Sequence, residues 1–215
     1  MANRKLKTTL AVAGLVGALT IGGIMAYFTD TETATNTFTV GQVDIVQEEP
    51  NWTPPTDITP NQTIKKDPQV KNIGSNDAFI FTEVKVPYKE VVVATDAGAK
   101  QTKAYTELFS YTVNTAWTEV GTPDLEKAKT DGYVTHLYAY GTNTACTKLA
   151  KETGVTPKLF ETVKFANVIE GQNLENTTLE IPVTSYAIQT EDINGGKTAP
   201  ADVWSVLNTQ LPTNK

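Results

Sequence analysis

Residues 66–87 read KDPQVKNIGSNDAFIFTEVKVP, and this stretch predicts two β-strands joined by a turn. The segment Lys66–Ile73 runs into Gly74-Ser75-Asn76-Asp77, four residues with strong turn chemistry. Ala78–Pro87 follows as a strand in which apolar residues occupy both faces at its start. Strands that are apolar on both faces are typical of the middle of a sheet, so we expect Ala78–Pro87 to be a central strand.

Further short strands are predicted on both sides of this stretch. Their patterns alternate or are rich in Val, Ile, Thr and aromatic residues, and Gly, Pro or Asn separates them. They cover Val43–Ile45, Val91–Val93, Tyr105–Asn114, Ala116–Val120 (pairing with Tyr105–Asn114), Tyr133–Tyr140, 157–165 and Thr178–Thr190, the cleanest of them. About nine or ten short strands, at spacings of roughly 8 to 15 residues, predict an all-β protein, a jelly-roll-like β-sandwich with short peripheral helices.

The peripheral segments are less regular. Glu48–Pro60 contains four prolines and is predicted to be an irregular loop. Pro123–Thr130 is expected to form a helical turn, and Pro200–Leu207 a helix with Pro at its start and Asp202 in its first turn. Asn143–Gly154 is interpreted as either a short helix or a loop insertion.

The N-terminal 26 residues have the features of an export signal. Arg4, Lys5 and Lys7 precede an uncharged, mostly apolar run from Leu10 to Met25, which is short for a membrane span. A small residue, Ala26, follows the run, and we expect cleavage between Ala26 and Tyr27. The alternative is an N-terminal anchor that stays uncut.

Charge and cysteine content restrict the function. Loss of segment 1–26, with its three basic residues, changes the net charge of the 215-residue chain from −6 to −9. Nucleic acid and anionic membrane surfaces require a basic footprint and are therefore unexpected partners. The only cysteine, Cys146, cannot form an intramolecular disulfide, so burial and sheet hydrogen bonds must stabilise the protein.

Few residues suggest catalysis or metal binding. His136 is the only histidine, which rules out a His-rich zinc site and an HExxH helix, and no GxSxG motif accompanies it. A structural or surface role is expected for His136. Cys146 is expected to be a buried inert thiol or a semi-exposed one, and an intermolecular disulfide is the remaining alternative. Asp192–Gly196 resembles part of a calcium loop without its remaining ligands. We predict no catalytic residues, no cofactor and no metal.

Several stretches together resemble the TasA/camelysin family of secreted biofilm-matrix proteins. The first is the junction after the signal, Ala26–Thr33 followed by Asn36–Phe38 and Gly41–Ile45. The second is Lys66–Phe79, which is similar to the family's K-D-P-x-V-x-N-x-G-S hairpin. Further blocks are Leu159-Phe160 with Val163, and Tyr186–Thr190 ahead of a helix with Trp204. Thr142–Thr156 departs from the pattern and looks inserted.

The resemblance implies a jelly-roll domain, processing by a signal peptidase of the SipW type, and assembly into extracellular fibres by donor-strand exchange. The chain would then comprise a signal peptide (1–26), a donor segment (27–38) and a jelly-roll domain (39–215). The donor residues would be Tyr27, Phe28, Thr29, Asp30, Thr31, Glu32, Thr33, Ala34, Thr35, Asn36, Thr37 and Phe38. No continuous apolar face runs through them, so the register of the donor strand stays open.

The partners expected from this interpretation are further copies of the chain, the signal peptidase and an accessory matrix protein, at the cell surface or in the extracellular matrix. Three alternatives remain at this level. Residues 27–38 form a loose tail or pair within their own subunit; the protein is a metalloprotease, as camelysin-type members have been classed; or it is a surface adhesin that binds carbohydrate through Trp117, Tyr133, Tyr138 and Tyr140.

Overall fold

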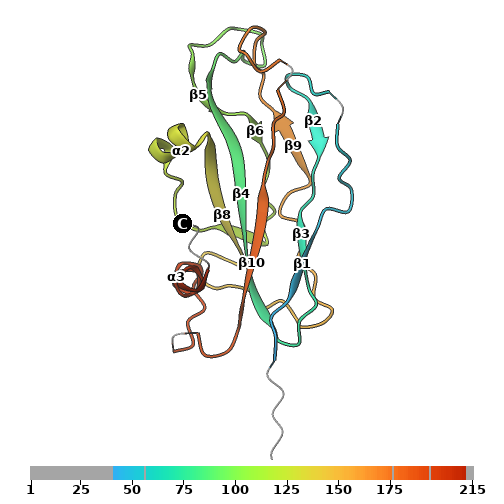
Figure 1. The fold of residues 1–215 in the computed structure, drawn as a ribbon, viewed down its shortest axis with the longest axis vertical. Coiled ribbons are helices and arrows are strands. Elements are labelled where there is room, and N and C mark those ends of the chain that lie inside the picture. The colour runs from blue at the N-terminus through green and yellow to red at the C-terminus, as the bar shows by residue number, and fades with distance from the viewer. Residues whose placement is uncertain (1–40, 56, 176, 194, 212–215) are drawn as a thin grey trace, which may run out of the picture. The chain divides into compact units, whose positions relative to one another are not determined.

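The computed structural model describes residues 41–211 except 56, 176 and 194. Ten strands and two helices lie in this part of the chain, and they confirm the all-β prediction (Figure 1). The strands are β1 (Ile45–Glu48), β2 (Thr63–Lys65), β3 (Gln69–Asn72), β4 (Ala78–Val91), β5 (Ala104–Glu107), β6 (Phe109–Ser110), β7 (Trp117–Glu119), β8 (Tyr133–Tyr140), β9 (Thr162–Phe165) and β10 (Val183–Gln189); the helices are α2 (Leu125–Asp131) and α3 (Pro200–Gln210).

The main sheet has the antiparallel order β10-β4-β8-β7, with β5 pairing to the far end of β4. β4 is central, as its two apolar faces predict, since Phe81 lies between Tyr186 of β10 and Ala139 of β8. The prediction of a separate strand at Val91–Val93 is wrong, because β4 continues through Pro87 to Val91. Pro87 has no N–H to donate, but pairing continues through its carbonyl, which accepts from the Leu108 amide, and through the Tyr88 amide, which donates to the Gly132 carbonyl.

The second layer is built along the segment 155–165. The start of this segment lies beside β3, where the Thr156 amide donates to the Val70 carbonyl. The end of the segment is β9, which pairs with β2 and β6. β1 pairs with the free side of β3. The layer therefore covers one face of the main sheet with short strands, interrupted near Pro68, which cannot donate to a ladder.

The predicted turn at Gly74–Asp77 is present, but it does not close a hairpin. β3 pairs with β1 in the second layer, whereas β4 pairs with β8 and β10 in the main sheet. The turn thus carries the chain from one layer to the other. Gly74 is required by close approach, because a Cβ there would lie 2.5 Å from the Gln42 carbonyl oxygen.

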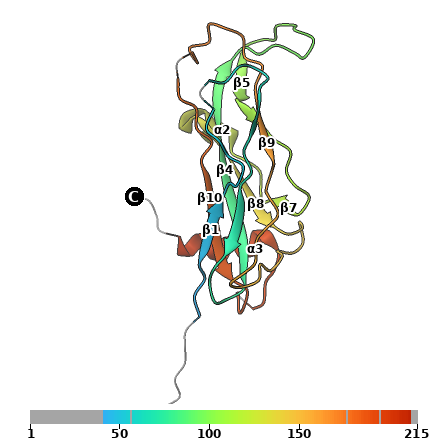
Figure 2. The ribbon, with the colours of Figure 1, turned by 90° about the vertical axis from the view of Figure 1, so that its right-hand side faces the viewer.

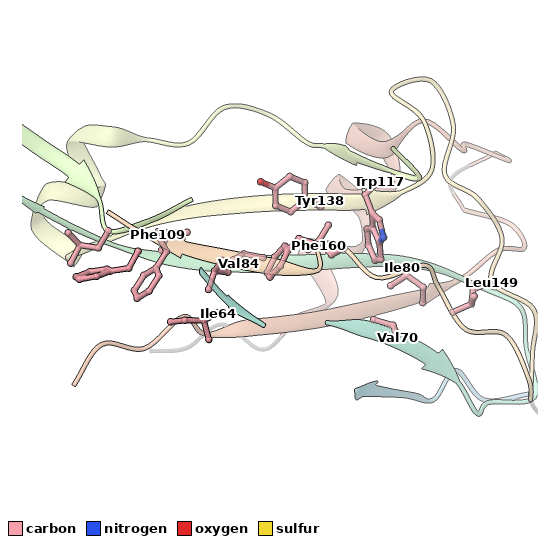
Figure 3. Packing of buried hydrophobic residues seen from close by; sticks show 14 of the residues in the cluster. Ile64, Val70, Ile80, Val84, Phe109, Trp117, Tyr138, Leu149 and Phe160 are labelled. Atoms are coloured by element: carbon pink, nitrogen blue, oxygen red, sulfur yellow. The ribbon is translucent and has the colours of Figure 1, made fainter. Parts of the chain in front are cut away.

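The main core lies between the two layers (Figure 3). Figure 3 shows Val84 and Ile80 of β4 pointing into the same interior as Ile64 and Val70 of the second layer. The opposite face of the main sheet is covered in one half by α3, which buries Val203 and Leu207 against Phe79 and Phe81 (Figures 1 and 2). The expected helix at Pro200 is therefore confirmed, and it covers half of the face that the second layer leaves free.

Other local expectations need correction. Tyr105–Asn114 is not one strand but divides at Leu108 into β5 and β6, which join different sheets. Trp117–Glu119 pairs with β8 and not with Tyr105–Asn114. Of the two alternatives for Asn143–Gly154, the structure shows the loop, held by isolated bridges such as Ala78 with Leu149. Periodicity alone does not identify a strand's partner, which explains these errors.

The aromatic residues considered for carbohydrate binding serve mainly in packing. Trp117 and Tyr138 are buried in the main core, with exposed fractions of 5% and 4%. Tyr140 is half-buried and packs against Trp117 at 5.6 Å between ring centroids. No flat exposed aromatic platform is formed by these residues, so their presence in the sequence does not favour the adhesin hypothesis.

Candidate functional site: an open groove beside β2

A groove of about 690 Å³ opens at the side of the sandwich. Its floor is formed by side chains that also belong to the main core: Ile64, Phe109, Val163, Phe165 and Val168. Its walls come from the loop between β1 and β2, from β2 itself, and from the segment that leads into β10. The core is therefore continuous with a cleft at this position.

One wall of the groove is an edge strand. β2 is the terminal strand in the order β2-β9-β6. The Gln62 carbonyl accepts from Phe165 and the Lys66 amide donates to Glu161, so the even-numbered residues of β2 are directed toward β9. Because alternate residues of an antiparallel strand point their backbone groups to opposite sides, Thr63 and Lys65 direct their N–H and C=O groups away from β9, toward the free edge of the sheet.

The opposite wall is the segment 178–181, which does not form the strand that the sequence predicts. The sequence predicts a continuous strand at Thr178–Thr190, but β10 begins only at Val183. Pro182 ends the ladder: its carbonyl accepts from the Lys85 amide, and it has no N–H to continue the pairing. Within the described residues, 178–181 make no backbone hydrogen bond to the sandwich.

The loop 49–60 covers the groove and is irregular, as its prolines predict. Its base is fixed by buried polar contacts, in which Asn51 donates to the Asp67 carboxylate at 2.7 Å and Glu49 pairs with Lys66 at 2.8 Å. Burial alone would raise the pKa of Asp67, but the bonds from Lys158 and Asn51 outweigh it and lower that pKa. From Thr53 to Ile58, the described residues make no backbone hydrogen bond to the sandwich.

This arrangement suits the addition of an extended chain. An edge strand with free backbone groups provides main-chain hydrogen bonds, and an apolar floor accepts alternate side chains. The cover between Thr53 and Ile58 is held by side-chain packing, such as that of Ile58 against the main core, and not by a strand ladder. A segment entering the groove would complete the side of the sandwich.

A second polar cluster surrounds His136 of β8 in the main sheet. The Nδ1 atom is 2.8 Å from an oxygen of Glu119, and the Nε2 atom is 3.0 Å from an oxygen of Glu107. Tyr138 stacks on the ring, and the Tyr138 hydroxyl lies 3.1 Å from the Tyr111 hydroxyl. Burial raises the pKa of Tyr111, and it raises the pKa of Tyr138 to about 12, so both hydroxyls keep their protons at physiological pH.

The two carboxylates determine the charge of His136. Burial alone would lower the pKa of His136, but hydrogen bonds to Glu107 and Glu119 raise it above its usual value. Only the imidazolium donates from both ring nitrogens, so the contact with both acids requires the charged form. The protonated ring thereby links β5, β7 and β8.

His136→Gln is expected to destabilise the protein at pH 5.5 by about 1–2 kcal/mol, the value of charge-assisted hydrogen bonds at a partly exposed site. A pKa raised by folding contributes stability that is complete below the unfolded value, about 6.5, and is lost as pH rises through the folded value. The difference between parent and variant in urea unfolding should therefore shrink by pH 9. A pH-independent difference would contradict the assignment of the charge.

Other candidate residues are structural. Cys146 is buried against Phe79 and Ala139, and burial raises the pKa of its thiol to about 12, as expected for an inert cysteine. In the described part of the chain, no group of three or more His, Cys, Asp or Glu side chains is placed to hold a metal ion. No helix among the described residues is long and apolar enough to cross a membrane.

The predicted cleavage site at Ala26 and Tyr27 and the predicted donor residues 27–38 lie outside the described residues. The groove is not among the features predicted from the sequence. The sequence nevertheless contains two signals for the groove, the prolines of Glu48–Pro60 and Pro182. Both mark places where a strand ladder cannot continue.

Fold and groove together define a β-sandwich protein whose core is left open beside an edge strand. The chain belongs to the camelysin metallo-endopeptidase family, whose family model matches residues 1–192. This match confirms the family resemblance. Searches of curated proteins and of solved structures found no match.

The residues of this chain do not fit the histidine-based zinc site of known metallopeptidases. Such sites use two or three histidines, and the chain has one. The Nδ1 atom of that histidine contacts Glu119, and its Nε2 atom contacts Glu107. The two carboxylates therefore lie on different sides of the ring and cannot both bind the same metal ion as one of its nitrogens.

Proposed function

We propose that this protein is a secreted structural subunit that assembles into extracellular matrix fibres, with residues 27–38 of one copy entering the groove of the next. The observation that carries the proposal is the open groove, where core side chains meet the free edge of β2. Family membership supports it, because the resemblance to TasA-like proteins implies matrix fibres. Release of segment 1–26 would free the donor segment outside the cell.

The positions of groove and chain exit favour a filament. The groove lies in the half of the sandwich that contains β2 and β9, whereas β1, which follows the donor segment, begins in the other half (Figure 1). Donor and acceptor surfaces are thus different parts of the subunit. A contact between different surfaces is heterologous, and one that does not close into a ring extends without limit.

A synthetic peptide of residues 27–40 is expected to bind a subunit that starts at Thr39. Trp52 lines the groove and is 38% exposed, so its fluorescence should shift to shorter wavelength when the peptide covers it. The melting temperature should rise with peptide concentration, because a ligand that binds only the folded state stabilises it. Titration of fluorescence, with a melting curve at each concentration, measures both effects.

Two controls make this titration specific. A peptide of the same composition in scrambled order should not bind, and Trp52→Phe should lose the fluorescence change while it keeps the rise in melting temperature. Absence of both signals with the native peptide at millimolar concentration would contradict insertion into the groove.

The family description favours a second candidate function, a metal-dependent endopeptidase. Purification of the protein distinguishes these two functions. A peptidase activity of this chain would remain proportional to the protein through successive columns and would be abolished by a chelator. An activity that separates from the protein belongs to a contaminant and leaves the structural function as the better account.

A further inference from the structure

Six large apolar side chains are exposed in the described part of the chain, and three of them gather in one place. These are Val46, Ile73 and Val155, with exposed fractions of 41%, 45% and 44%. Single exposed apolar residues are ordinary on a protein surface, but a contiguous group marks an interaction site.

The strand register puts the three side chains on one face. Val46 of β1 lies opposite Lys71 of β3, and Lys71 lies opposite Val155. Directly opposed residues of antiparallel strands point to the same side, and Ile73, two residues after Lys71, shares that side. The neighbouring inward positions Val70 and Asn72 are buried, which confirms that the row Val46–Lys71–Val155 faces away from the core.

The row and Ile73, named here the β1–β3 patch, lie where the donor segment joins the sandwich. The Ile73 amide donates to the carbonyl of Asp44, the residue before β1. If residues 27–38 occupy the groove of a neighbouring copy, only residues 39–44 connect the inserted strand to β1. Six residues span at most about 20 Å, so the neighbour must lie against this part of the donor subunit.

From these observations we infer that the β1–β3 patch is a contact surface for a second copy of this chain, docking on the rim of the groove that receives the donor segment. The inference rests on the proposed function. It adds a second contact, which fixes the orientation of the neighbour after the strand has entered.

The rim of the groove has the matching chemistry. Its exposed apolar residues, Trp52, Pro54 and Pro55, suit the three apolar side chains of the patch. The rim also carries four exposed acids, which suit the Lys71 ammonium: Asp57, Glu170, Glu175 and Glu180. None of these four acids forms an ion pair within the described part of the chain. Apolar contact with a polar, charged margin is the usual composition of a specific interface.

The triple variant Val46→Thr, Ile73→Thr, Val155→Thr in residues 27–215 tests the inference. Threonine retains the strand preference and removes apolar contact, so the fold should persist and the critical concentration for filaments should rise about tenfold or more. Sedimentation and electron microscopy measure this. Lys71→Glu should also raise the critical concentration, and added salt should reduce this increase because it screens the repulsion between the new carboxylate and the acids of the rim.

The matched control is Tyr105→Thr with Leu125→Gln, two equally exposed apolar residues outside the patch. This control should assemble like the parent. Melting curves establish that all variants are folded. The triple change, placed in subunits that start at Thr39, should leave binding of peptide 27–40 unchanged, because the groove is intact.

The outcomes test the β1–β3 patch separately from the proposed insertion of the donor segment into the groove. Parent-like assembly of the triple variant, with peptide binding retained, would overturn the patch and leave the proposed function standing. Failure of the peptide to bind the parent groove would overturn the proposed function, and the inference with it. Impaired assembly of the control variant to the same degree would show that the effect is not specific and would also overturn the patch.

Discussion

Subunits that begin at Thr39 are expected to remain monomeric under conditions in which subunits that begin at Tyr27 form filaments. The shorter chain keeps both described cores and the groove, because all of their described residues lie beyond position 41. It lacks only the segment proposed to enter the groove of the next copy. Negative-stain electron microscopy and sedimentation of the two proteins, side by side, measure the difference.

A chain of the longer length with residues 27–38 in scrambled order is the matched control. It has the same charge and the same N-terminal length, so it should behave like the shorter chain if sequence-specific insertion drives assembly. Filaments from all three proteins would place the contact elsewhere. Monomers from all three, over a range of salt, pH and concentration, would favour a different function or the need for an assembly partner.

Phe160→Ala is expected to reduce the free energy of unfolding by about 3–5 kcal/mol. Phe160 is 1% exposed and stacks on Tyr111, with 4.4 Å between ring centroids. It lies in the segment that ties β3 and β9 into one layer, so its truncation leaves a cavity between the layers. Urea unfolding at neutral pH measures the change.

Phe160→Leu keeps most of the volume and should cost less than half as much as the alanine variant. Val155→Ala, in the same segment but at a position that is 44% exposed, should have an effect of about 0.5 kcal/mol or less. Equal losses for Phe160→Ala and Val155→Ala would contradict the assignment of this segment to the core.

These variants divide the molecule into parts with different roles. Phe160 stabilises the folded subunit, whereas the groove and the β1–β3 patch are expected to affect assembly alone. A change that weakens assembly therefore has to be compared with the melting temperature of the same variant. Only a loss of assembly without a loss of stability supports a role in the fibre.

The sequence by itself determined the class of fold and the positions of most elements. Alternating and doubly apolar patterns identify strands because the side-chain period of a strand is two residues, and this local property is retained in β4 and β8. Turn residues at Gly74–Asp77 and Pro at the start of α3 likewise act locally. The single histidine also limits the metal chemistry of the chain, and this limit follows from composition alone.

Only the tertiary structure decided which strands pair and where the sandwich stays open. The turn after β3 joins two layers instead of closing a hairpin, because β3 finds β1 and β4 finds β8 and β10. The edge of β2, the ladder that ends at Pro182 and the row Val46–Lys71–Val155 all depend on pairing between residues distant in sequence. Such pairing is set by the total burial of the folded chain, and no local pattern encodes it.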